Sequence, residues 1–401
     1  VVHTADEAPV VWSRSSPDPR PMAQRDTPRP LPALPSGDQP AVRVRDPGDL
    51  IAAVPAVLGF HPRESLVLIA TGGPTGRRVG LTLRVDLPPP EDAGAVCRHA
   101  AATLLSGEPR GAAVLVIGGS PGPQPPRRDV AAAALEALSG HGVEVHTLVW
   151  ARSTAGAAPW ACYESCGCRG SVPDPAASPA LAGAVVAGKV VFTDRSELER
   201  LVAPADREAL RRREKLLTGQ VDAEITRPDP PGPEAAAQAW AVVEAAIAEA
   251  ATGRLALDDA RVIALARALA LPQVRDAALG ACTDSRAAAA EQVWAALARE
   301  TPDPEVAEPA ALLAASALAR GDGALANVAL ERARRAWPDH RLTALLHSVA
   351  AVGIRPERFR ECLAAGVAAG GPLPRSREPG AGAPGPAAGG SGSRRRRERR
   401  R

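Results

Sequence analysis

Residues 113–150 contain three segments in a row: AVLVI (113–117), DVAAAALEAL (129–138) and VEVHTLVW (143–150). The first and third are short apolar runs with many β-branched residues, a composition typical of buried strands. The middle segment is rich in alanine and leucine and predicts a helix. A strand, a helix and a strand in this order predict a βαβ unit with two parallel strands.

Segments on both sides of this unit extend the alternation of strands and helices. Upstream, Asp46 and Pro47 are typical of a helix start, and Gly59 is typical of a helix end. Strands predicted at residues 65–70 and 79–87 flank a glycine-rich turn and form an antiparallel hairpin. We therefore expect residues 42–225 to fold as an α/β domain with a mostly parallel or mixed sheet. Its other predicted elements are helices at 91–105, 179–187, 196–201 and 206–217 and a short strand at 190–192.

The sequence changes character at residues 226–233 (TRPDPPGP), where the prolines predict a linker. Residues 234–370 are alanine-rich and helical in pattern throughout, with breaks at glycines, at prolines and at Thr283. They predict an all-α domain built from helical hairpins. Residues 307–340 fit one tetratricopeptide-like unit, because small residues such as Ala326 and Ala333 let two helices approach closely.

Composition limits the class of protein. The chain has 401 residues, 45% hydrophobic and 23% charged, which indicates a folded protein of two or three domains. Residues 1–41 are rich in proline, and residues 371–401 are low in complexity, so both are predicted to be disordered. No run of 18 apolar residues is free of charge, and we expect no membrane partner. Residues 1–30 lack the apolar core of a secretory signal, so the expected location is cytoplasmic.

The net charge of +3 is unevenly distributed. Residues 394–401 contribute +6 through seven arginines and one glutamate, so the rest of the chain is slightly acidic. The folded part therefore lacks the electrostatic signature of a nucleic-acid-binding domain. The arginine tail could contact nucleic acid weakly at physiological salt, or it could be a solvated tail.

Cys162, Cys166 and Cys168 form the sharpest local cluster of potential metal ligands. Structural zinc takes four nitrogen or sulfur ligands, so a fourth ligand would have to come from His141 or His146. The single residue between Cys166 and Cys168 also makes joint binding difficult. A buried turn with small thiols and a redox-sensitive pair are the alternatives.

A second group of candidates lies around the predicted strand ends and could bind a ligand. His61 and Arg63 precede the first strand, where they could serve acid–base chemistry or simply set the angle of strand entry. Arg84 and Asp86 are two residues apart and share one face of a strand, which is either a buried face near a ligand or an exposed edge. Trp160 and Tyr163 lie beside the cysteines and suggest a partly buried hairpin, in which the Tyr163 hydroxyl needs a partner. No catalytic motif with correct spacing accompanies them, and the sequence assigns no cofactor.

Several segments carry a resemblance to a known family. The most specific is LGFHPRESLVLI (58–69). The others are VRDPGDLIAAVP (44–55), RVDLP (84–88), WACY (160–163), VRDAAL (274–279) and GDGALA (321–326). Together they resemble the actinobacterial family catalogued as domain of unknown function 4192, over roughly residues 42–366. The resemblance brings no activity, substrate or partner with it.

Two functional hypotheses follow from these observations. The first is a non-enzymatic binding or adaptor protein that contacts a protein partner through its helical half. The alternative is an enzyme or small-ligand-binding protein with its site at the strand ends near His61 and Asp86.

Overall fold

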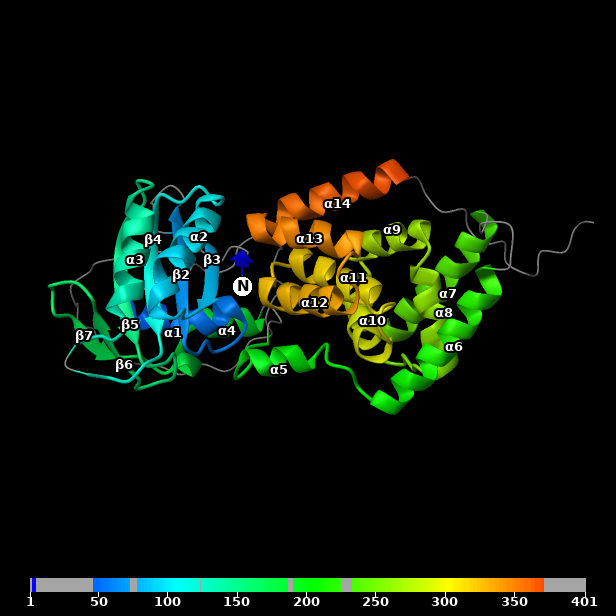
Figure 1. The fold of residues 1–401 in the computed structure, drawn as a ribbon, viewed down its shortest axis with the longest axis horizontal. Helices are drawn as coiled ribbons and strands as arrows, with labels where there is room; N and C mark the ends of the chain where they lie inside the picture. Colours follow the sequence, from blue (N-terminus) through cyan, green and yellow to red (C-terminus); the bar gives the residue numbers. More distant parts are fainter. Residues whose placement is uncertain are drawn as a thin grey trace, which may run out of the picture.

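The computed structural model describes residues 2–4, 46–72, 78–122, 124–186, 190–225 and 233–370. Within these residues, every strand precedes residue 172, and everything after residue 195 that is regular is helical. The sheet with its covering helices lies at one end of the molecule, and the helical half lies at the other (Figure 1).

The sheet has seven strands in the order β1-β3-β2-β4-β5-β6-β7. Their bounds are β1 (Val2–Thr4), β2 (Ser65–Gly72), β3 (Arg78–Asp86), β4 (Gly111–Ile117), β5 (Glu144–Ala151), β6 (Pro159–Cys162) and β7 (Arg169–Ser171). The predicted βαβ unit is present as β4, α3 (Arg128–Ser139) and β5, and these two strands are parallel.

The sheet is mixed, which is one of the two arrangements expected from the sequence. Only β4 and β5 form a parallel pair among the described strands, and the other neighbours are antiparallel. The chain crosses from β3 to β4 through α2 (Ala93–Leu105), and β2 lies between these two strands with the opposite direction. The pattern of each segment predicts a strand but does not encode which strands become neighbours.

β1 was not predicted, the hairpin suggested beside Trp160 is present as β6 and β7, and one predicted strand is reduced to a single bridge. β6 and β7 are short and carry little apolar pattern, and Val2–Thr4 pairs with the edge strand β3 although a leader without packed elements was expected there. The segment at 190–192 contributes only the bridge between Phe60 and Phe192, outside the sheet. Residues 5–41 and 371–401, where disorder was predicted, lie outside the described residues, as do residues 226–232 of the predicted linker.

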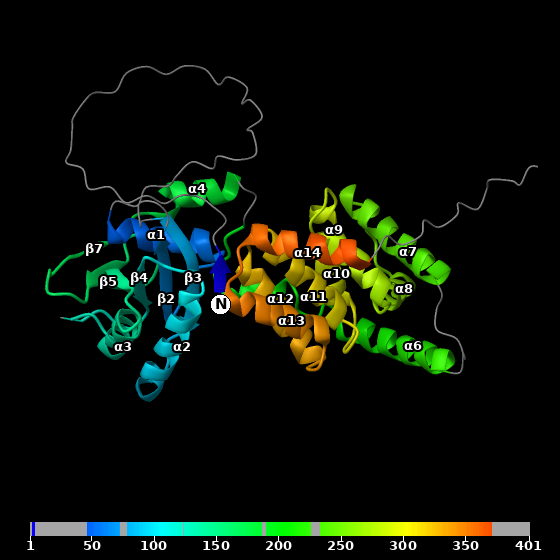
Figure 2. The same cartoon turned by 90° about the horizontal axis from the view of Figure 1, so that it is seen from above.

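Helices cover both faces of the sheet (Figure 2). α1 (Pro47–Leu58) and α4 (Pro179–Val186) lie on one side, and α2 and α3 lie on the other. Alternate side chains of β2 serve the two faces, with Val67 packing on the α1 side and Leu66 on the α2 and α3 side. α1 begins and ends as predicted, because Asp46 Oδ1 accepts from the Asp49 amide at 3.0 Å and Gly59 adopts φ +76°.

The second half consists of helices that break at the predicted glycines and prolines. They are α7 (Pro233–Ala251), α8 (Asp259–Leu269), α9 (Pro272–Ala281), α10 (Ala287–Glu300), α11 (Ala307–Ala319), α12 (Gly323–Ala336), α13 (Arg341–Val352) and α14 (Pro356–Gly370). Every residue of α11 except Glu308 is buried, and α10, α12 and α13 pack around it. The two helices of the tetratricopeptide-like unit, α11 and α12, pack together, while the tetratricopeptide geometry itself stays a prediction.

Two further helices, α5 (Arg195–Arg200) and α6 (Arg207–Ile225), join the halves. α5 contacts α12, and α6 contacts α8. Leu198 and Val202 belong to one cluster of buried apolar side chains that runs from the α1 face of the sheet into the helical half. The domain limits at 225 and 234 stay predictions, and these contacts attach α5 and α6 to the helices that follow. None of the described helices is both long enough and apolar enough to cross a membrane.

Candidate functional site

The carboxyl ends of β3, β4 and β5 lie at one edge of the sheet, since these strands run in the same direction. β2 runs the opposite way, so the loop that enters it at Ser65 passes the same edge. Ligands of α/β sheets bind at edges of this kind. The loop residues His61 and Arg63 and the strand residues Arg84 and Asp86 are therefore all near this edge.

Arg84 is buried at this edge and is held by three oxygens. Its Nε donates to Ser65 Oγ at 2.7 Å, while its Nη2 lies 3.3 Å from the Arg63 carbonyl oxygen and 2.5 Å from Asp86 Oδ1. Burial lowers the pKa of the Arg84 guanidinium, against the opposing effect of Asp86, and the charge of Arg195 lowers it further. The shared strand face is thus buried at Arg84, which is 7% exposed, and open at Asp86, which is 81% exposed.

Two residues beside this edge have left-handed backbone conformations. They are Glu64, with φ 41°, and Arg127, with φ 54°. Glu64 Oε1 accepts from the Gly119 amide at 2.9 Å and lies over Gly118, whose φ is +122°. Arg127 Nη2 lies 2.9 Å from Asp129 Oδ2. Each such non-glycine residue costs about 1–3 kcal/mol, and backbone strain of this kind is concentrated at functional sites.

His61 and Tyr163 make contacts of their own. His61 Nδ1 lies 2.8 Å from Thr154 Oγ1, a hydroxyl in a residue that is 1% exposed. Burial lowers the pKa of His61, and the nearby charge of Arg63 lowers it further. Tyr163 Oη donates to the Pro126 carbonyl at 2.6 Å within the core on the α2 and α3 side. The five candidate residues therefore make three separate sets of contacts.

The three cysteines do come together. The sulfur atoms of Cys162, Cys166 and Cys168 all lie within 4.8 Å of one another at the β6–β7 hairpin. Neither His141 nor His146 joins this group, and His146 Nδ1 instead lies 3.4 Å from Glu144 Oε1 at the start of β5. The fourth protein ligand weighed from the sequence is therefore not supplied by either histidine.

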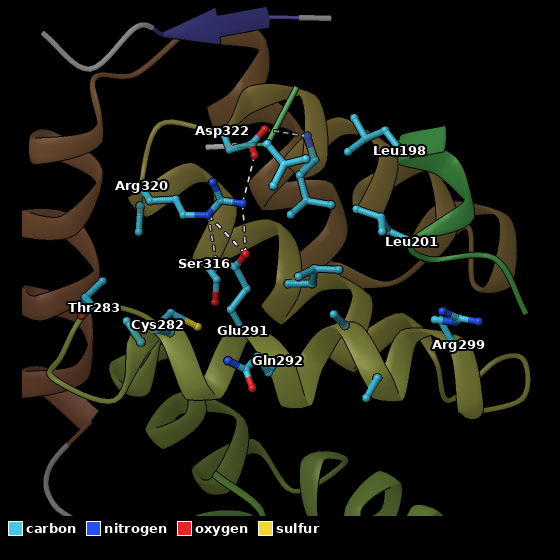
Figure 3. A pocket seen from close by; sticks show the side chains of 18 of the residues that line it. Leu198, Leu201, Cys282, Thr283, Glu291, Gln292, Arg299, Ser316, Arg320 and Asp322 are labelled. Carbon is cyan, nitrogen blue, oxygen red and sulfur yellow. Dashed lines mark hydrogen bonds and ion pairs between the residues drawn. The ribbon is translucent and has the colours of Figure 1, made fainter. Parts of the chain in front are cut away.

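A cleft of about 880 Å³ lies between the segment around α5 and the helices α10, α11 and α12 (Figure 3). Leu198 and Leu201 face it from the α5 segment, and small side chains such as Ala288 and Ala295 line it from α10. Val190 and Leu201 are among the exposed large hydrophobic residues of the chain, with exposures of 65% and 36%. The cleft thus exposes apolar surface within a concave site.

Charged side chains form one wall of this cleft (Figure 3). Arg320 Nε lies 2.9 Å from Glu291 Oε2, and Arg320 Nη2 lies 2.9 Å from Asp322 Oδ2. Burial acts to lower the pKa of Arg320, but the carboxylates of Asp322 and Glu291 outweigh it and raise the pKa. Asp322 also accepts from the Leu325 amide at 3.0 Å as the cap of α12. The three charges therefore satisfy one another and hold the α11–α12 turn against α10.

A buried hydroxyl lies near these charges. Ser316 on α11 lines the cleft, is 3% exposed, and its Oγ makes no hydrogen bond within the described part of the chain. Its neighbour is the sulfur of Cys282, a weak acceptor to which the hydroxyl can donate, and Cys282 Sγ itself lies 3.3 Å from the Ala278 carbonyl oxygen and 3.6 Å from that of Leu312. A buried hydroxyl with only a weak sulfur acceptor is under-satisfied, so a ligand group that reaches Ser316 would give it a stronger hydrogen bond.

One known protein family matches most of the chain. A family described as a domain of unknown function has a model that matches residues 47–357. The chain belongs to the DUF4192 family. The match confirms the resemblance and covers the sheet edge, the cysteine hairpin and all of the cleft lining except Arg360. No curated protein and no solved structure matches this DUF4192 chain.

Sequence reasoning missed the cleft of the DUF4192 chain. Its lining comes from five separate places between residues 190 and 360, and nine of its twenty residues are alanine or leucine. In a sequence, such residues indicate ordinary helix cores, and no short motif links the five places. The available signal was Ser316, a polar residue in the apolar run that follows Glu308 in α11, where a buried hydroxyl needs a hydrogen-bond partner.

Proposed function

We propose that this DUF4192 protein is a non-enzymatic binding protein that holds a small amphipathic molecule in the cleft beside α5. The observation that carries the proposal is the buried Ser316 hydroxyl in the wall of a largely apolar cleft, where its neighbouring acceptor is only the weak one of the Cys282 sulfur. The cleft volume of about 880 Å³ lies within the usual range for small-molecule sites.

The lining indicates the chemistry of the ligand. Leu198, Leu201 and the alanines of α10 would bury an apolar body. Ser316 can donate or accept a hydrogen bond, and Gln292 offers an amide at the same side of the cleft. Because Arg320 is already held by two carboxylates, the ion cluster offers no free cation to an acidic ligand. We therefore expect a ligand with an apolar body and a hydrogen-bonding end that meets Ser316 and Gln292 rather than Arg320.

Binding fits this cleft better than catalysis. Its most nucleophilic atom is the sulfur of Cys282, and burial raises the pKa of this thiol to about 12. At neutral pH the thiol is then almost wholly protonated, and the protonated form is a poor nucleophile. The predicted protein partner of the helical half stays a prediction. The predicted nucleic-acid contact of residues 394–401 falls outside the described residues.

The proposal is tested with Nile red, a neutral dye with an apolar ring system and a carbonyl, titrated into the full chain. We expect saturable binding of one dye molecule. Ala288→Trp, which fills the cleft from an exposed position on α10, should weaken binding tenfold or more. Ala132→Trp, at an exposed position on α3, is the matched control and should leave the affinity within twofold.

Equal dye binding by the two tryptophan variants would refute the cleft as the site. Ser316→Ala tests the polar end separately, because it removes the hydroxyl and leaves the apolar walls. We expect it to weaken a hydrogen-bonding dye and to raise stability slightly by removing a buried, under-satisfied group. Unchanged affinity together with unchanged stability would contradict the role given to Ser316.

The strand-end edge supports a second candidate, a site for a polar small ligand near His61 and Asp86. The observation in its favour is the pair of left-handed residues, Glu64 and Arg127, at the carboxyl ends of the parallel strands. A thermal-shift screen of nucleotides and sugar phosphates tests it, because a ligand that binds only the folded state raises Tm. Hits should disappear in His61→Ala and Asp86→Ala. Hits that persist in both variants would remove this candidate, and so would a screen that gives no hits with the wild-type chain.

A further inference from the structure

The hairpin of β6 and β7 brings three thiols to one point. Cys162 ends β6, and Cys166 and Cys168 lie in the loop that leads to β7. Their sulfur atoms lie within 4.8 Å of one another. Sulfurs bound about 2.3 Å from a tetrahedral metal are about 3.8 Å apart, so a small inward movement of the thiols is enough to bind one.

The loop conformation explains how a one-residue gap allows this. Gly167 has φ +66°, a left-handed conformation that turns the chain between Cys166 and Cys168. The Cys162 amide donates to the Cys168 carbonyl at 2.8 Å and closes the loop. The Cys168 amide nitrogen lies 3.4 Å from Cys166 Sγ, so the backbone also donates to one of the sulfurs. The sequence objection to joint binding is therefore met by the glycine between the two cysteines.

We propose that Cys162, Cys166 and Cys168 bind one thiophilic metal ion, with Zn²⁺ as the expected ion, and leave its fourth position open. Three soft sulfur ligands select this class of ion over Mg²⁺ or Ca²⁺. Within the described residues, no histidine or carboxylate joins the three thiols. Cys166 and Cys168 are exposed, so water or a ligand from outside can reach the fourth position.

Binding converts the three thiols to thiolates, and their three protons pass to the solvent. Three metal–sulfur bonds form, and no atom is oxidised or reduced. The ion would tie the end of β6 to the start of β7 and fix the loop that carries Tyr163, whose hydroxyl reaches the Pro126 carbonyl. The site is separate from the cleft beside α5 and does not depend on the function proposed for it.

The test uses the full chain, reduced and kept free of oxygen, and Co²⁺ as a spectroscopic substitute for Zn²⁺. We expect a thiolate-to-cobalt charge-transfer band and tetrahedral ligand-field bands that saturate at one equivalent, and Zn²⁺ should remove them. Cys166→Ser and Cys168→Ser should each weaken Co²⁺ binding tenfold or more. Cys362→Ser, at another exposed cysteine, is the control and should leave the spectrum unchanged.

Three results would overturn the proposal. The first is a reduced wild-type chain that gives no charge-transfer band, a result that needs no variant to fold. The second is a band that Cys166→Ser and Cys168→Ser retain at full strength. The third is a disulfide between two of the three cysteines that persists in mild reductant, seen as a mass two hydrogens lower, because such a pair could not bind metal.

Discussion

Arg213 Nε donates to Asp259 Oδ1 at 2.7 Å and ties α6 to α8 from a side chain that is only 6% exposed. The same guanidinium reaches the Glu300 carboxylate and its carbonyl oxygen at the end of α10. Arg212, the adjacent residue, also contacts Asp259, at 3.3 Å, but its side chain is 52% exposed. Two neighbouring arginines thus share one carboxylate from positions of very different burial.

This difference predicts unequal stability losses. Arg213→Met leaves Asp259 and Glu300 without their buried cation and should lower the free energy of unfolding by about 2–4 kcal/mol. Arg212→Met removes an exposed pair and should cost no more than about 1 kcal/mol. Urea unfolding of both variants measures the difference. Equal losses would mean that α6 is not held to the helical half in the way described.

The same pair predicts a dependence on pH. The hydrogen bond from Arg213 lowers the pKa of Asp259, and Arg212 contributes in the same direction. A carboxyl with a lowered folded-state pKa adds stability above its unfolded pKa of about 3.9, and this stability is lost as the pH falls through the folded value. The gap in unfolding free energy between wild type and Arg213→Met should therefore narrow below about pH 4. A gap that stays constant from pH 6 to pH 3 would contradict this.

Local structure was predictable where a short segment determines it. α1 begins after Asp46 and ends at Gly59, as the capping chemistry of these two residues requires. Each helix break in residues 234–370 falls at a predicted glycine, proline or threonine. The helix predicted at 196–201 begins one residue earlier as α5, because the Asp194 side chain accepts the amide of Glu197 and caps the helix.

The order of the strands in the sheet was predictable only where the connection between two strands is short. The parallel pairing of β4 and β5 follows from one helix between them, whereas the place of β2 between β3 and β4 depends on a crossover that no segment encodes. For the candidate sites, spacing placed Arg84 beside Asp86 but could not show that Gly167 would turn the cysteines toward one point. The cleft beside α5 depends on residues more than a hundred positions apart, so it required the structure.

Gly118 and Glu64 give a third prediction. A Cβ at Gly118 would lie 2.5 Å from Glu64 Oε1, and the φ of +122° is strained for any other residue. Gly118→Ala should lower the free energy of unfolding by about 2–3 kcal/mol, because it adds backbone strain and pushes Glu64 away from the Gly119 amide. Gly142 has a φ of +76° but free space where a Cβ would lie. Gly142→Ala should therefore lower the free energy of unfolding by only about 1 kcal/mol.

A double variant separates the two causes at Gly118. Adding Glu64→Ala to Gly118→Ala removes the crowding but keeps the backbone strain, so part of the lost stability should return. Strictly additive losses in thermal or urea unfolding would show that Glu64 is not pressed against this position.

Ser65 gives a fourth prediction, concerning the buried cation at the sheet edge. Ser65 is fully buried, and its Oγ accepts from Arg84 Nε while it donates to the Arg63 carbonyl at 2.7 Å. Ser65→Ala removes the acceptor of a buried charged donor and should cost about 1–3 kcal/mol. Ser139→Ala, at an exposed position on α3, is the control and should change the free energy of unfolding by less than about 0.5 kcal/mol. A loss no larger than that of the control would contradict the described bond.

The remaining cysteines predict a pattern of chemical labelling. Burial raises the pKa of Cys282 to about 12 and that of Cys97 to about 11, whereas Cys362 is exposed. At pH 8 only about one molecule in ten thousand carries a Cys282 thiolate, so iodoacetamide should modify Cys362 first and spare the other two until urea unfolds the chain. Mass spectrometry of peptides over time gives the order. Because Cys282 lines the cleft, its modification at the rate of Cys362 without denaturant would mean that α5 opens widely in solution, and the cleft would then lack the fixed walls that specific binding requires.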